Sequence, residues 1–245
     1  MNLKGTKTLE NLMKAFAGES QARNRYTFYA SVAKKEGYEQ IAAIFTETAD
    51  NEKEHAKVFF KHILEGMASE LPITVHVDAD YPVELRTTRE NLKAAAAGEN
   101  EEWTMLYPAF ADVADRILLD AKPPKGSDRP GGLGESFDWG LLSALDPDLP
   151  IMLSGGLTPD NVAEKEGFKD VANSFRQIAK VENRHEARYL KLLDNIEKCK
   201  VFKREEKVLW KCGNCGYILE AKEAPDVCPA CKHPKSYFEL FCETY

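Results

Sequence analysis

The sequence has no run of 18 apolar residues, and its first residues, Met-Asn-Leu-Lys-Gly, contain no apolar signal region. It also lacks a long basic run, and the formal net charge is −7. These absences argue against a membrane span and against nucleic acid or an anionic membrane as a partner. We therefore expect a cytoplasmic protein. Apolar residues make up 43% of the 245 residues, which is enough for hydrophobic cores.

Cysteine is scarce, yet four of the six cysteines form two Cys-x-x-Cys pairs: Cys212, Cys215, Cys228 and Cys231. In a reducing compartment such pairs indicate metal ligands rather than disulfides. Four thiolates suit a tetrahedral site for zinc, which would be structural, or for iron, which would carry one electron. Residues 207–245 are too few for an ordinary core, so we expect the metal to hold this domain together. Cys199 and Cys242 have no such pattern.

Apolar residues recur at helical spacing over most of the remaining chain. The predicted helices cover residues 8–35, 38–66, 86–114 and 168–198. Gly37 and Gly66 are expected to end the first two helices, and Thr88 to start the third. Pro108 is expected to kink the third helix. Residues 67–82 form a long connection that must cross a four-helix bundle.

Each half of the chain carries a lone helical glutamate and then a Glu-x-x-His sequence. In a four-helix bundle this pattern supplies a di-metal carboxylate centre. Residues three apart on a helix share a face, which adds Glu102 beside Glu99, whereas Ala22 stands at the matching place in the first half. The predicted ligands are Glu19, Glu52, His55, Glu99, Glu102, Glu182 and His185. Their mixed oxygen and nitrogen donors suit iron or manganese.

The alternative is that these glutamates belong to solvated helix faces. That alternative is favoured for a single Glu-x-x-His, but not for two in a duplicated frame. Tyr26 lies seven residues after Glu19, and Tyr107 lies eight after Glu99. Both tyrosines could hydrogen-bond a ligand, although core packing would also explain them.

The two halves align through Gly37 and Gly167, but the second half contains about 50 additional residues, at 115–164. They fall at a hairpin tip, where insertion is tolerated, and closing the longer loop costs only about 2–3 kcal/mol. Ile117–Leu119 and Ile151–Leu153 have strand character. Asp138–Leu145 suits a helix, and Thr158 suits a helix start.

The sequence resembles rubrerythrin over residues 1–114 and 165–245. The runs that carry the resemblance are Ala17-Gly-Glu-Ser-Gln-Ala-Arg23, Glu52-Lys-Glu-His-Ala56, Ala97-Gly-Glu-Asn-Glu-Glu-Trp103 and Cys228-Pro-Ala-Cys-Lys-His-Pro-Lys235. The resemblance implies a mainly α fold, with a ferritin-like bundle at 1–114 and 165–198, and a rubredoxin-like Fe(Cys)4 domain at 207–245. It further implies two irons in the bundle, a homodimer, and reduction of hydrogen peroxide to water.

By the same resemblance, Glu102 and His55 are alternative ligands to one iron, exchanged as the redox state changes. Together with Tyr26 and Tyr107 they are the predicted catalytic residues. The electron donor would be a rubredoxin or an NAD(P)H-dependent reductase. Open alternatives are an iron-binding or iron-oxidising protein without a peroxidase role, and a structural zinc-ribbon protein.

Residues 115–164 resemble another family, phosphoribosylanthranilate isomerase, a TIM barrel. The resemblance rests on Ile117-Leu-Leu-Asp-Ala-Lys122, Arg129-Pro-Gly-Gly-Leu-Gly134, Phe137-Asp-Trp139 and Leu153-Ser-Gly-Gly-Leu-Thr-Pro-Asp-Asn-Val162. It implies that Asp120 matches the general acid, and Gly155 and Gly156 a phosphate loop. A barrel needs eight strands, and the strand bearing the general-base cysteine is absent. We therefore interpret the chain as a chimera whose inserted fragment has no isomerase activity; a bifunctional enzyme is the alternative.

Overall fold

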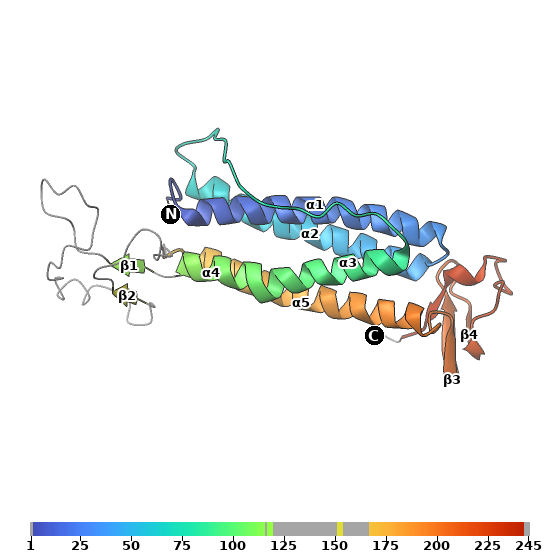
Figure 1. Ribbon diagram of the computed structural model, residues 1–245. Helices are drawn as coiled ribbons and strands as arrows, with labels where there is room; N and C mark the ends of the chain where they lie inside the picture. The colour runs from blue at the N-terminus through green and yellow to red at the C-terminus, as the bar shows by residue number, and fades with distance from the viewer. Residues whose placement is uncertain (1, 116, 120–150, 154–166, 243–245) are drawn as a thin grey trace, which may run out of the picture. The chain divides into compact units, whose positions relative to one another are not determined.

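The computed structural model describes residues 2–115, 117–119, 151–153 and 167–242. The helical elements are α1 (Lys7–Lys35), α2 (Glu39–Gly66), α3 (Thr88–Glu101), a π-helical turn (Glu102–Leu106), α4 (Tyr107–Asp115) and α5 (Lys169–Glu197) (Figure 1). These elements confirm the mainly α, ferritin-like prediction, with the third predicted helix divided in two. None of the described helices is long and apolar enough to cross a membrane.

The chain divides into two compact units, each containing sections of all four predicted helices. The first unit comprises Met1–Phe16, Lys57–Ala79 and Trp103–Lys180; the second comprises Ala17–Ala56, Asp80–Glu102 and Val181–Tyr245. The first is filled by an apolar cluster in which the rings of Phe59 and Phe175 stack at 4.9 Å. The predicted domain boundaries, including those of the insert, stay predictions.

Aromatic residues fill the core of the second unit, beside the predicted metal ligands. Tyr26, Tyr29, Phe45 and Tyr189 are all at most 2% exposed. Their rings pack at centroid distances of 5.2 to 6.1 Å, with Tyr26 and Tyr189 edge to face. Burying several large rings supplies much of the apolar area that stabilises such a core.

The helix ends follow local sequence chemistry. Gly37 has φ +82° and ends α1, a backbone conformation that glycine adopts without strain. The third helix begins at Thr88, as predicted, and Thr87 is its N-cap, with Thr87 and Glu90 forming a capping box. Gly66 ends α2, as predicted. A Cβ there would overlap Cγ and Cδ1 of Leu3, so close packing explains this glycine.

The third predicted helix is irregular, but the irregularity comes before Pro108 and not at it. Pro108 stands in the first turn of α4, where its missing N–H is least costly. The π turn Glu102–Leu106 comes directly before this helix. A π turn accommodates one residue more than an α turn.

The connection after α2 contacts α1 in both units. Ile73 and Val75 pack against the cluster that contains Leu12, and Gly18 faces the ring of Tyr81, with Cε1 3.9 Å from where a Cβ would lie. The connection therefore lies over α1 before the chain enters α3.

Two short strands confirm the strand prediction in the insert. β1 (Ile117–Leu119) and β2 (Ile151–Leu153) pair in parallel, with Ile117 opposite Ile151. The predicted helix at 138–145, the helix start at Thr158, and Asp120, Gly155 and Gly156 lie outside the described residues.

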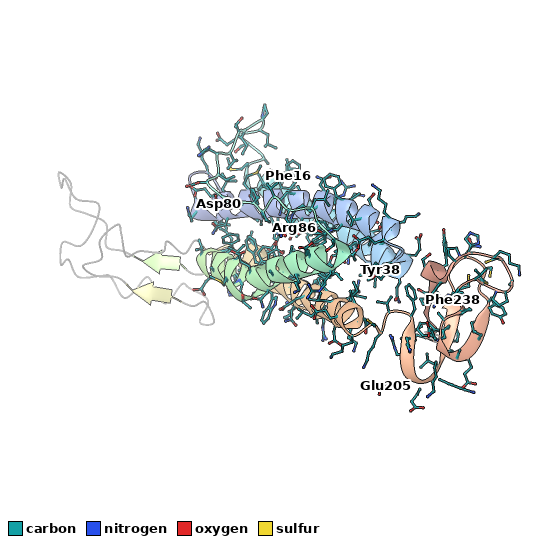
Figure 2. The ribbon with its side chains drawn as sticks, turned by 45° about the vertical axis from the view of Figure 1, so that its right-hand side comes forward. Phe16, Tyr38, Asp80, Arg86, Glu205 and Phe238 are labelled. Carbon is teal, nitrogen blue, oxygen red and sulfur yellow. The ribbon has the colours of Figure 1, made fainter. Side chains whose placement is uncertain are left out.

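The small C-terminal domain is a three-stranded antiparallel sheet of order β4–β3–β5. Its strands are β3 (Lys203–Cys212), β4 (Ile218–Glu223) and β5 (Phe238–Leu240). Trp210 and Phe238, the latter labelled in Figure 2, are at most 1% exposed and form its core with two of the cysteines. The indole N–H of Trp210 donates to the Ala221 carbonyl at 3.1 Å. The predicted small β metal domain is confirmed.

Candidate metal centres

The second unit gathers six of the seven predicted ligands into two overlapping groups. One group contains Glu19, Glu52, His55 and Glu182; the other contains Glu52, Glu99, Glu182 and His185. Within each group, one donor atom from every residue lies within 4.8 Å of the others. Glu19 comes from α1, Glu52 and His55 from α2, Glu99 from α3, and Glu182 and His185 from α5.

The two shared glutamates face both histidines. Glu182 places Oε1 2.8 Å from Nδ1 of His55 and Oε2 2.7 Å from Nδ1 of His185. Glu52 places Oε2 2.9 Å from the first of these nitrogens and Oε1 3.3 Å from the second. Each carboxylate thus offers one oxygen to each group, which is the geometry of a bridging ligand between two cations.

Glu19 and Glu99 belong to one group each. Oε1 of Glu19 lies 3.8 Å from Nδ1 of His55, and Oε2 of Glu99 lies 3.6 Å from Nδ1 of His185. Each group therefore combines one terminal carboxylate, one imidazole and two shared carboxylates. This near-symmetry follows the duplication seen in the sequence.

The chemistry of the donors fits metal ions. Oε1 of Glu52, Oε2 of Glu99, both oxygens of Glu182 and Nδ1 of His185 are fully buried, and they contact one another and His55. Buried polar atoms normally have partners, and four buried carboxylates repel one another. Two cations at the centres of the groups would satisfy the lone pairs and offset this repulsion.

The pKa values within the cluster show the same electrostatic conflict. Burial, and then the charge of Glu52, raises the pKa of Glu99 well above its usual range. Burial opposes the charged form of both histidines, yet the hydrogen bonds that they donate to Glu182 and Glu52 raise the pKa of His55 to about 9 and that of His185 to about 12. Without cations, protons must balance these carboxylates; metal loading would therefore release protons.

Glu102, the seventh predicted ligand, lies outside both groups. It is half-buried at the start of the π turn. Burial, and then the charge of Glu99, raises the pKa of Glu102 well above its usual range, and Glu182 and Glu52 add to this effect. The structure therefore has His55 within the group of four and Glu102 beside it, and the predicted ligand roles stay predictions.

The π turn explains a difference between the two halves. The second half has eight residues from Glu99 to Tyr107, one more than the seven from Glu19 to Tyr26. The π turn within Glu102–Leu106 absorbs that residue.

The shifted register continues to the hairpin. The backbone N–H of Tyr38 donates to the carbonyl of Ala33, and that of Phe168 donates to the carbonyl of Ala114. Tyr38 and Phe168 each follow a glycine with positive φ. Ala33 and Ala114 are 81 residues apart, as are Tyr26 and Tyr107. The hairpin bond is thus retained despite the insert. The sequence analysis missed the π turn, although the eight-residue spacing was its signal.

The two predicted tyrosines differ in what the structure shows. The hydroxyl of Tyr26 donates to Oε1 of Glu99 at 2.6 Å. Burial, and then the charge of Glu99, raises the pKa of Tyr26 well above its usual range, so this hydroxyl keeps its proton. Tyr107 is buried in α4, with its ring 5.6 Å from that of Phe59. The role predicted for Tyr107 stays a prediction.

The sequence analysis also missed Asn51, which directly precedes Glu52. Its side-chain nitrogen Nδ2 lies 3.3 Å from Nε2 of His185, the ring nitrogen that faces away from the carboxylates. The sequence did contain a signal for Asn51: a polar residue precedes the first Glu-x-x-His sequence, whereas Val181 precedes the second.

Four cysteines form the second centre. Cys212 and Cys231 place their Sγ atoms 3.7 Å apart, as do Cys215 and Cys228. All four Sγ atoms lie within 4.8 Å of one another. Sulfur atoms at this spacing can surround one tetrahedral metal ion.

The two halves of this centre have the same backbone bonds. Cys212 donates its N–H to Tyr217 O and accepts from Gly216 N; Cys228 donates to His233 O and accepts from Lys232 N. The residue after each Cys-x-x-Cys has positive φ, +77° at Gly216 and +63° at Lys232. The two sequence pairs therefore fold into matching metal-binding turns.

Neighbouring groups shift the pKa values of two of the thiols in opposite directions. The backbone N–H of His233 lowers the pKa of Cys231 to about 5. The N–H of Tyr217 lowers the pKa of Cys215, but hydrogen bonds with the other thiols outweigh it and raise that pKa to about 12. One thiolate is therefore favoured, while four together need a cation to offset their charge.

A four-helix scaffold with paired Glu-x-x-His ligands defines the class of di-iron carboxylate proteins, here joined to a four-cysteine module. Comparison with protein families gives the same result. The family model "Rubrerythrin" matches residues 10–121, and the model "Rubrerythrin, rubredoxin-like domain" matches residues 210–239.

Rubrerythrin-1 of Clostridium acetobutylicum is 50% identical over 245 residues, covering 100% of this chain and 99% of that protein. The chain therefore belongs to the rubrerythrin family. The bundle has the family's di-iron site, and the small domain its rubredoxin-like four-cysteine site.

Two further comparisons concern the insert and the fold. The N-(5'-phosphoribosyl)anthranilate isomerase of Rhodopseudomonas palustris strain BisB18 is 68% identical over 57 residues, covering 23% of this chain and 26% of that enzyme. A solved structure entitled "Mixed valant state of nigerythrin" is 24% identical, with a TM-score of 0.49, and the match covers 98% of this chain and 92% of that one.

Proposed function

We propose that the protein reduces hydrogen peroxide to water at the di-iron site, with electrons delivered through the four-cysteine centre. The observation that carries the proposal is the double-sided placement of Glu52 and Glu182, each with one oxygen toward each histidine. Carboxylates placed in this way could hold two metal ions close enough to act on one small substrate. The four-cysteine centre in the same chain supports a redox role over metal storage.

The reaction consumes one peroxide, two electrons and two protons, and yields two water molecules. A ferrous pair bound at the site supplies the two electrons and polarises the O–O bond. Glu19, Glu52, Glu99, Glu182, His55 and His185 are the proposed ligands, and Glu102 is the proposed alternative to His55.

The protein's own residues orient the site and exclude water from it. The Tyr26 hydroxyl donates to Oε1 of Glu99, which leaves Oε2 of that carboxylate directed toward His185. The four grouped carboxylates are at most 1% exposed, so solvent cannot compete for the ligand atoms. Glu102 or a water molecule would supply protons to the departing oxygen.

Electrons would enter from an external donor such as a rubredoxin or an NAD(P)H-dependent reductase. The segment between α5 and β3, residues 198–202, is short. We propose a homodimer in which the small domain of one subunit serves the bundle of its partner.

Anaerobic stopped-flow measurement of the reduced protein would test the function. We expect fast oxidation by one equivalent of peroxide per ferrous pair, and slow oxidation by dioxygen. Faster consumption of dioxygen than of peroxide would instead support an iron-oxidising role. A colourless protein that contains zinc at the four cysteines would exclude the proposed electron route, because ferric Fe(Cys)4 is red.

Two cysteine variants test the contributions of the two metal centres separately. Cys215→Ser should leave the single-turnover reaction of the reduced di-iron site intact, but abolish sustained peroxide turnover with an external donor. Cys199→Ser is the matched control, because Cys199 is also exposed but lies outside the four-cysteine group. Equal loss in both variants, or none in Cys215→Ser, would contradict the proposed route.

We propose no isomerase activity for residues 115–164, because the related segment covers only 26% of the isomerase relative. Expression of the chain in a strain that lacks the isomerase tests this, and we expect no growth without tryptophan.

A further inference from the structure

His185 uses its two ring nitrogens for different partners. Nδ1 faces the carboxylates, 2.7 Å from Oε2 of Glu182, and Nε2 lies 3.3 Å from the side-chain nitrogen of Asn51. An imidazole that binds a metal through Nδ1 carries its proton on Nε2 and can only donate there. Two nitrogens that both donate cannot bond, so the amide of Asn51 must present its oxygen instead. The oxygen and nitrogen of an amide are assigned from such partners.

We propose that Asn51 is a positioning residue, whose side-chain oxygen accepts the Nε2–H of His185 and keeps this histidine on its metal while His55 can be exchanged. The inference rests on the proposed ligand set and on the proposed exchange with Glu102. An outer hydrogen bond of this kind fixes both the tautomer and the ring orientation of a metal-bound histidine.

His55 lacks an equivalent restraint in the described part of the chain. All the hydrogen bonds and ion pairs it forms there use Nδ1. In the duplicated frame, Val181 stands directly before Glu182 where Asn51 stands before Glu52. A valine side chain has no hydrogen-bonding group. The duplicated halves therefore restrain one histidine and not the other.

The ring N–H signals of the full-length protein loaded with Zn²⁺ provide the test. In ¹H–¹⁵N spectra we expect a slowly exchanging Nε2–H of His185, assigned by its loss in His185→Gln. The signal should disappear in Asn51→Leu, which keeps the size but removes the acceptor. It should persist in Asn51→Asp, which keeps an acceptor oxygen but removes the Nδ2 donor.

Metal affinity gives a second readout. Titration of the metal-free protein with Co²⁺ should show that Asn51→Leu weakens one of the two bundle sites by about 10-fold to 100-fold, the usual effect of losing an outer hydrogen bond. The other site should be nearly unchanged. Val181→Asn should make His55 harder to exchange, seen as slower substitution of its Nδ1 ligation when the oxidised iron protein is formed.

An unchanged His185 signal in Asn51→Leu, equal weakening of both sites, or loss of the signal in Asn51→Asp would overturn the proposal. Because Zn²⁺ is redox-inert, these results do not depend on peroxide reduction. A protein that keeps the signal pattern but reduces no peroxide would contradict the proposed function alone.

Discussion

The double-sided contacts of Glu182 predict that its loss affects both metals, whereas loss of Glu19 affects one. In Glu182→Gln, one oxygen remains and the other becomes an amide nitrogen, which carries protons and cannot bind a metal. The lost oxygen faces either His55 or His185, at 2.8 or 2.7 Å. Since Glu182 belongs to both groups of candidate ligands, we expect both sites to weaken. Glu19→Gln removes a ligand from the His55 group only.

Loss of an outer hydrogen-bond partner already weakens metal binding by about 10-fold to 100-fold. Loss of a ligand should therefore cost at least about 100-fold in affinity, or about 3 kcal/mol. Anaerobic Co²⁺ titration against a competing chelator would count the sites and rank their affinities. We expect two weakened sites in Glu182→Gln and one in Glu19→Gln. Two weakened sites in Glu19→Gln and one in Glu182→Gln would refute the assignment of the bridge.

Three stability predictions follow from backbone geometry, each measured by urea or thermal denaturation. Gly66→Ala should destabilise by about 1–3 kcal/mol because its Cβ overlaps a packed side chain, whereas Gly98→Ala, with open space at its Cβ, should stabilise by about 0.5–1 kcal/mol. Gly216→Ala should destabilise the small domain by about 1–2 kcal/mol and Lys232→Gly should stabilise it by about 1 kcal/mol, since both positions have positive φ; the opposite signs would contradict the matched turns. Deletion of residues 116–166 should leave the metal content unchanged and stabilise by at most about 2–3 kcal/mol; loss of the bundle metals would contradict an insert without a role in the site.

The sequence predicted the helices well because their apolar spacing is regular over long segments. It also predicted which glutamates and histidines share a face, and the structure places six of the seven together. Spacing along a helix fixes a side chain's direction, which explains why these groupings could be predicted without tertiary information. The ligand roles themselves remain predictions.

The errors lie where tertiary contacts override local signals. Gly66 ends α2 as predicted, but the sequence did not reveal its close contact with Leu3, which is distant in the sequence. The predicted kink at Pro108 followed the usual effect of proline, but the π turn before it provides the irregularity. A π turn has no reliable composition of its own, and only the comparison of the two halves reveals the extra residue.

Three differences between the halves concern the same question, namely which ligand is free to move. Glu102 occupies the place of Ala22, the π turn begins at Glu102, and Asn51 corresponds to Val181. The first two place an additional carboxylate within electrostatic range of Glu99, Glu182 and Glu52, and the third places the amide of Asn51 against His185. A perfectly symmetrical duplication would give two equivalent metals with no preference for exchange at either. The departures from symmetry make the surroundings of His55 and His185 unequal, which supports the proposal that only one of the two histidines is exchanged.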